Sequence, residues 1–185
     1  MKRLVIDTET TGLRPDHHQV LTIGMSLIDV NPSKLKFIDE EHIFVKHDEY
    51  NLSKTAMRIT GININEHHKI GIFPKLACKK VNKFLDLHSL NEIPILGHCV
   101  HFDKNFLRVM FKDEGLELPF SEKKEDTRYI WENLRRKGLI NPSKNAKLGT
   151  IAEHFGIDYS KAHDALADCR ITAKCYHRML PMTKI

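Results

Sequence analysis

The chain has 185 residues, of which 41% are hydrophobic and 29% charged. That length is enough for one hydrophobic core, and we expect residues 1–185 to form a single domain. The formal net charge of +5 favours a polyanionic partner only weakly. A charge at Asp7 interrupts the apolar stretch that a signal peptide needs, and no run approaches the roughly 20 apolar residues of a membrane span. We therefore expect a cytoplasmic protein without membrane contact.

The predicted elements begin with strands and continue with helices. Residues rich in β-branched and aromatic side chains predict strands at 3–7, 20–30 and 35–45, joined as two hairpins. A helical period follows at 73–85 and 102–111, with a short apolar run at 93–97 between them that predicts a buried strand. Further helices fit 127–136, 147–155 and 164–180. This order predicts an α/β fold, in which three antiparallel N-terminal strands and shorter strands form a mixed sheet flanked by helices.

Acidic residues stand at the ends of these elements. The period of two along the first strand places Asp7 and Glu9 on the same face at its C-terminal end. Asp103 lies at the start of the helix that follows the buried strand, where an acid also has an ordinary role near a helix N-terminus. Each of these features alone is more often structural than catalytic.

The last polar group is formed by His163 and Asp168. Five residues apart on one helix, these side chains would diverge by about 140°. They can converge only if His163 precedes the first turn, which Asp164 near the helix start favours.

Taken in order, three stretches resemble the DnaQ-like, or DEDDh, 3′→5′ exonucleases. They are VIDTETTGL at 5–13, GHCVHFD at 97–103 and AHDALAD at 162–168, with weaker matches at 60–62 and 126–127. The resemblance covers nearly the whole chain and implies an RNase H-like fold. Cys99 is a departure, because this family usually has an asparagine there. That position is outside the five defining residues, all of which are filled.

Four converging carboxylates need cations, because two like charges 4 Å apart repel by about 4 kcal/mol at an effective dielectric of 20. Oxygen ligands favour Mg²⁺ or Mn²⁺, and two such ions suit hydrolysis of a phosphodiester. The resemblance implies that Asp7 bridges both ions, that Glu9 and Asp168 complete the shell of the first, and that Asp103 serves the second. It also implies that His163 takes the proton from the attacking water.

The resemblance further implies that the backbone after the first strand receives the 3′-terminal nucleotide. The candidate substrate-binding residues are Thr8, Thr10, Leu13, His98 and Phe102. Leu13 is either an apolar wedge beside the last bases or an ordinary turn-capping core residue. Phe102 is either a stacking platform or part of the core. His98 either contacts the substrate or orders its own loop.

A basic segment lies between the second and third stretches. Its residues are Arg135, Arg136, Lys137, Lys144 and Lys147, near the aromatic residues Tyr129 and Trp131. We weigh two interpretations equally: a surface that tracks phosphates while the aromatic rings stack on unpaired bases, or a solvated helix face followed by a loop.

The leading hypothesis is a metal-dependent exonuclease acting on 3′ ends of single-stranded DNA. An exoribonuclease that trims RNA or short oligoribonucleotides is the alternative, and a non-catalytic accessory subunit of a polymerase is a third reading. Because the chain ends at Ile185, soon after the last predicted helix, we expect an independent enzyme, with a polymerase or repair partner left open. No heptad seam or isolated apolar stripe indicates an oligomeric state.

Overall fold

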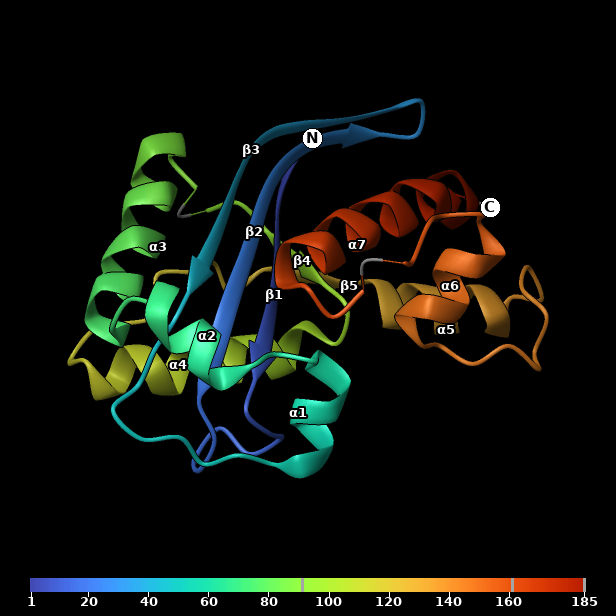
Figure 1. Cartoon of the computed structure of the whole chain (residues 1–185). Helices are drawn as coiled ribbons and strands as arrows, with labels where there is room; N and C mark the ends of the chain where they lie inside the picture. The colour runs from blue at the N-terminus through green and yellow to red at the C-terminus, as the bar shows by residue number, and fades with distance from the viewer. Residues whose placement is uncertain (91, 161, 185) are drawn as a thin grey trace.

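A five-stranded sheet runs through the middle of the molecule (Figure 1). The structure, a computed structural model, describes residues 1–90, 92–160 and 162–184. Its elements, in chain order, are β1 (Lys2–Thr10), β2 (Val20–Asn31), β3 (Lys34–Phe44), α1 (Lys54–Thr60), α2 (Ile64–Ile70), α3 (Pro74–His88), β4 (Ile95–Gly97), α4 (Val100–Asp113), β5 (Lys124–Asp126), α5 (Thr127–Arg136), α6 (Leu148–His154), α7 (Ala165–Met179) and a short 3₁₀ helix (Leu180–Lys184).

The strand order is β3-β2-β1-β4-β5, so β1 lies at the centre of the sheet. β1, β2 and β3 pair antiparallel, whereas β4 and β5 run parallel to β1. The predicted mixed sheet, with two N-terminal hairpins and shorter strands beyond them, is confirmed. The sequence did not single out β5 and α2. β5 has only three residues, Lys124–Asp126, and its pairing with β4 defines it rather than any hydrophobic pattern.

Two layers of helices cover the sheet (Figure 1). α3 and α4 pack against the face that carries Leu4 and Ile6 of β1. α7 packs against the opposite face, where Val5 of β1 and Cys169 of α7 belong to one hydrophobic cluster. α5 and α6 then pack on α7 through a separate cluster that contains Trp131. Among the helices of the described ranges, none has the length and apolar character needed to cross a bilayer.

Gly24 lets the first turn of α7 lie directly on the sheet. A Cβ atom built on Gly24 would stand 2.4 Å from the backbone oxygen of Ala165, a separation that no side chain can adopt. Gly24 is also the register partner of Asp7 on the neighbouring strand. This close approach therefore brings the start of α7 next to the C-terminal half of β1.

Candidate functional site

Three polar side chains from the two ends of the chain meet beside the sheet. Glu9 lies near the end of β1, His163 precedes α7, and Asp168 lies in the first turn of α7. One potential ligand atom from each of the three lies within 4.8 Å of the others. Glu9 and Asp168 are buried, whereas His163 is exposed. The site thus has a buried acidic floor and an accessible imidazole.

The backbone before α7 brings His163 and Asp168 together. Asp164 is the N-cap of α7, and its carboxylate accepts a hydrogen bond from the Ala167 N–H at 2.8 Å. His163 has φ 69°, in the left-handed region, and its backbone N–H donates to Oδ2 of Asp168 at 3.1 Å. The expectation that His163 stands before the first turn is confirmed.

Asp103 reaches the same end of the sheet from α4. It is buried in the first turn of that helix, and its Oδ1 accepts hydrogen bonds from both the backbone N–H and the hydroxyl of Thr8, each at 2.8 Å. Asp7, between Ile6 and Thr8 on β1, is half-buried. Burial raises the pKa of Asp7 well above its ordinary value, and the charges of Asp103, Asp168 and Glu9 raise it further. The four carboxylates therefore lie within one another's electrostatic field.

The acids hold protons more tightly than isolated carboxylates do. Burial, followed by the charge of Asp168, raises the pKa of Glu9 to about 8. Burial raises the pKa of Asp103 to about 7, although the hydrogen bonds from Thr8 oppose that shift. Burial also raises the pKa of Asp168, against the hydrogen bond from His163. Either protons or cations must neutralise this cluster near neutral pH.

The donor set fits a divalent cation. Oδ1 of Asp168 is buried and has no hydrogen-bond partner among the described residues. A buried carboxylate oxygen without a partner is costly unless a cation or water satisfies it. Glu9 supplies a second carboxylate in the same cluster. Burial and the neighbouring carboxylates raise its pKa, so a bound cation would favour its charged form.

The substrate-binding candidates Thr8 and Thr10, at the end of β1, and Leu13, just after it, have three different environments. The Thr8 hydroxyl is taken up by Asp103, so this side chain holds the catalytic candidate rather than facing open solvent. The Thr10 hydroxyl donates to the backbone oxygen of Gly12 at 2.6 Å and closes the turn. Leu13 is 79% exposed, which excludes a core role for it and leaves its apolar side chain free.

His98 and Phe102 flank the start of α4. Nδ1 of His98 lies 2.9 Å from the hydroxyl of Thr127, and burial lowers the pKa of His98. Phe102 is partly buried, packs against the core and lies 4.8 Å from the Phe106 ring, centroid to centroid. Both residues thus contact other parts of the protein and remain partly exposed.

The interpretation of Trp131 as an aromatic ring that stacks on unpaired bases is wrong. Its side chain is fully buried in the cluster shared by α5, α6 and α7, so it cannot stack on an unpaired base. The apolar surface of an indole packs more favourably between helices than in water, and α6 and α7 supply that environment. Tyr129, which lies on the opposite side of α5, is 59% exposed.

A pocket next to the site contains residues that sequence reasoning missed. Its volume is about 300 Å³, and it extends from Glu9 and His163 to Thr22 of β2 and to His42 and Phe44 of β3. Thr22 is the register partner of Glu9, and its buried hydroxyl has no partner among the described residues. Only strand register places these side chains beside Glu9, and no local motif marks them.

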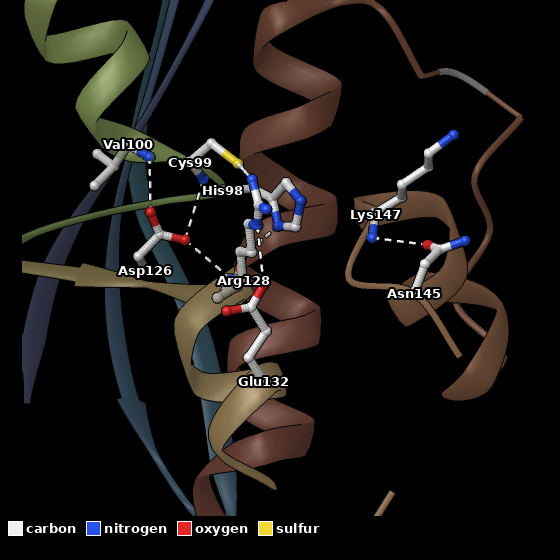
Figure 2. Close-up of polar contacts among 9 residues, drawn as sticks. His98, Cys99, Val100, Asp126, Arg128, Glu132, Asn145 and Lys147 are labelled. Atoms are coloured by element: carbon white, nitrogen blue, oxygen red, sulfur yellow. Dashed lines mark hydrogen bonds and ion pairs between the residues drawn. The ribbon is translucent and has the colours of Figure 1, made fainter. Parts of the chain in front are cut away.

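Asp126 was matched by the sequence analysis but given no role, and the structure supplies one. Its Oδ1 accepts from the N–H groups of Cys99 and Arg128 at 3.1 and 2.9 Å, and its Oδ2 accepts from the N–H of Val100 at 3.0 Å (Figure 2). One carboxylate therefore caps the N-termini of α4 and α5 together. Since α4 carries Asp103, these hydrogen bonds help to fix the position of Asp103 relative to β1.

Comparison with protein families gives one match over most of the chain. The family described as exonuclease, RNase_T, matches residues 4–176. The 3′-5′ exonuclease DinG of Staphylococcus aureus is 28% identical over 170 residues, which are 92% of this chain and 17% of that protein. The chain spans between 11% and 17% of the length of such curated relatives.

Solved structures share the fold. Escherichia coli exonuclease I in complex with a dT13 oligonucleotide has a TM-score of 0.80 and 23% identity, over 99% of this chain and 42% of that chain. The nuclease domain of 3′hExo, a DEDDh family member bound to rAMP, has a TM-score of 0.79 and 24% identity, over 98% of this chain and 92% of that chain. The predicted fold class is confirmed by these likenesses.

We expect the substitution Cys99→Asn to stabilise the protein. Cys99 has φ 63°, a left-handed conformation that asparagine tolerates better than cysteine. Relief of that strain should raise the free energy of unfolding by about 1 kcal/mol, measured by chemical denaturation. Cys99→Ala is the control, since it removes the thiol and retains the strain. Equal stability of the two variants would contradict this account of the backbone.

Without metal, the protein should become less stable as pH rises from about 4.5 to about 8. The folded-state pKa of Glu9 is raised from 4.5 to about 8, so over this interval the folded chain binds more protons than the unfolded chain. Thermal denaturation in EDTA, compared with denaturation in Mg²⁺ or Mn²⁺, checks this, because the cation should restore stability most at the alkaline end. Glu9→Gln should weaken both effects. A metal-free protein that gains stability over this interval would argue against a protonated cluster.

Proposed function

This chain belongs to the exonuclease family, and on that premise we propose that it hydrolyses the terminal phosphodiester bond at the 3′ end of single-stranded DNA and releases nucleoside monophosphates. The observation that carries the proposal is the meeting of Glu9, His163 and Asp168 within 4.8 Å. The direction is supported by the named activity of the S. aureus relative. The polymer is supported by the dT13 oligonucleotide bound to E. coli exonuclease I.

Divalent cations complete this site. We assign two ions, Mg²⁺ or Mn²⁺, to the four carboxylates of Asp7, Glu9, Asp103 and Asp168, because hard oxygen donors favour these metals. When bound, the ions would neutralise the cluster and polarise the phosphate group. Oδ1 of Asp168, which has no hydrogen-bond partner within the described ranges, and the raised pKa of Glu9 support this assignment.

The chain's own residues position and move protons. His163, exposed beside Glu9 and Asp168, accepts the proton of the attacking water. The hydrogen bond from its backbone N–H to Asp168 ties the position of the imidazole to that of the acid. Thr8 holds Asp103 through two hydrogen bonds. Because β1, α4 and α7 all contribute, we treat residues 1–185 as one exonuclease domain.

We place the 3′-terminal nucleotides of the DNA strand beside these groups. Leu13, exposed just after β1, is placed to act as an apolar wedge against the last bases. Thr10 sets the turn that presents Leu13, since its hydroxyl binds the oxygen of Gly12. His98 and Phe102 line the opposite approach, at the start of α4. A ribonucleotide strand is the second candidate substrate, favoured by the rAMP bound to the 3′hExo domain.

We expect 5′-labelled single-stranded DNA to yield a ladder of products shortened one nucleotide at a time in Mg²⁺ or Mn²⁺, and EDTA to abolish it. Asp103→Asn should lower the rate by at least about 10²-fold. Asp113→Asn, which removes an exposed carboxylate from the other end of α4, is the matched control and should retain the wild-type rate. A matched RNA oligomer degraded faster than DNA would move the proposal to an exoribonuclease.

In this assay, absence of a ladder on both polymers, with binding retained, would indicate a non-catalytic binding module. A circular substrate cut at a similar rate would indicate an endonuclease instead. Because the isolated chain is used, activity would also show that no polymerase or repair partner is required.

His163→Ala should lower the single-turnover rate by about 10²-fold. Loss of the imidazole removes the group that accepts the proton of the attacking water, so the chemical step should slow while DNA binding is retained. Single-turnover cleavage at saturating metal provides the measurement. His177→Ala, at the far end of α7, serves as the control histidine. A variant at position 163 that keeps the wild-type rate would remove this histidine from the mechanism.

A further inference from the structure

Arg128 lies at the rim of the candidate site, on a different helix from the catalytic candidates. Its Nη1 donates to the thiol of Cys99 at 3.6 Å, and its Nε donates to Oε1 of Glu132 at 3.1 Å. Figure 2 shows the guanidinium beside the imidazole of His98. The charge of Arg128 opposes protonation of His98, whose pKa is lowered first by burial, so the two groups are electrostatically close.

Hydrogen bonds hold the first turn of α5 against the start of α4, which fixes the position of the Arg128 backbone. Asp126 accepts from the backbone N–H of Arg128 and also from the N–H groups at the start of α4. Thr127 is fully buried, and its hydroxyl donates to the backbone oxygen of Gly97 at 3.1 Å. Displacement of the Arg128 backbone from α4 would therefore break these hydrogen bonds.

The guanidinium keeps donors free for a ligand. It has five N–H donors, of which Glu132 and Cys99 engage one each, so three have no partner among the described residues. A thiol is a weak acceptor, and the side chain of Arg128 is 49% exposed. Phosphate oxygens are stronger acceptors and match the planar fork of arginine.

The positive charge of Arg128 lies beside Cys99 and His98, at the start of α4. The pKa of Asp7 and of Glu9 is raised by burial and by other carboxylates, whereas the charge of Arg128 acts on Cys99 and His98. A strand entering this acidic cluster meets repulsion, so a cation beside the cluster lowers the cost of bringing the strand in. Such a cation serves a phosphate other than the one being hydrolysed.

We propose that Arg128 binds a non-reacting phosphodiester of the nucleic-acid strand and so forms a phosphate-binding position at the start of α5, in the gap between Cys99 and Glu132. This inference rests on the proposed function and adds a substrate-binding residue to it. It differs from the basic segment at the other end of α5, where Arg135 is engaged with the backbone oxygen of Pro142. Arg136 of that segment is exposed.

The test measures binding of a 5′-fluorescent single-stranded DNA by anisotropy in the Asp103→Asn background, across a range of salt concentrations. Arg128→Ala should weaken binding about tenfold and should reduce the slope of log K against log salt by about 0.7, the share of one phosphate contact on a single strand. Arg128→Lys should retain most of that slope. Arg178→Ala, which removes an exposed arginine from the last turn of α7, should leave both quantities unchanged.

In the otherwise wild-type chain, Arg128→Ala should raise KM for DNA while kcat stays within about twofold, the pattern of a contact that does not change in the transition state. Wild-type affinity and salt slope in Arg128→Ala would overturn the proposal, as would an equal loss in Arg136→Ala. The proposed function fails separately, when the wild-type chain releases no mononucleotides. The anisotropy comparison decides the role of Arg128 in either case.

Discussion

Mutual repulsion among Asp7, Glu9, Asp103 and Asp168 is the constraint on which the rest of this structure depends. Two like charges about 4 Å apart cost roughly 4 kcal/mol at an effective dielectric of 20, and burial adds a desolvation penalty for each acid. Nothing in the stability of a single domain favours such a cluster. The surrounding packing holds each acid in place, and the uncompensated negative charge favours the cation binding that we propose for this cluster.

Three features of the fold hold the acids against this repulsion. β1 is the central strand, and pairing with Gly24 and Thr22 of β2 anchors Asp7 and Glu9. Gly24 allows α7 to lie on the sheet, which brings Asp168 within reach of Glu9. Asp126 caps α4 and α5 with one carboxylate and thereby fixes the helix that carries Asp103. These features combine segments from the start, the middle and the end of the chain.

In our proposal, the residues that carry out hydrolysis and the residues that bind the nucleic-acid strand come from different elements. The carboxylates and His163 form one part of the site, while the start of α5 adds the exposed side chains of Arg128 and Tyr129. Arg128 lies beside Cys99, where the family usually has asparagine, and Tyr129 follows it at the surface. The departure at Cys99 thus falls beside the phosphate contact that we propose for Arg128 and leaves the acidic cluster complete. Variation at this rim is compatible with one chemistry acting on different strands.

The amino-acid sequence by itself determined most of the elements and, through the family resemblance, the expected chemistry. Alternation along 3–7 predicted β1 and the shared face of Asp7 and Glu9, and helical spacing predicted α3, α4, α5 and α7, because these signals are local and repeat over several residues. Tertiary structure alone decided which distant side chains meet. Strand register placed Thr22 beside Glu9, helix packing buried Trp131, and Asp126 joined two helices, since each of these depends on contacts between residues far apart in the chain.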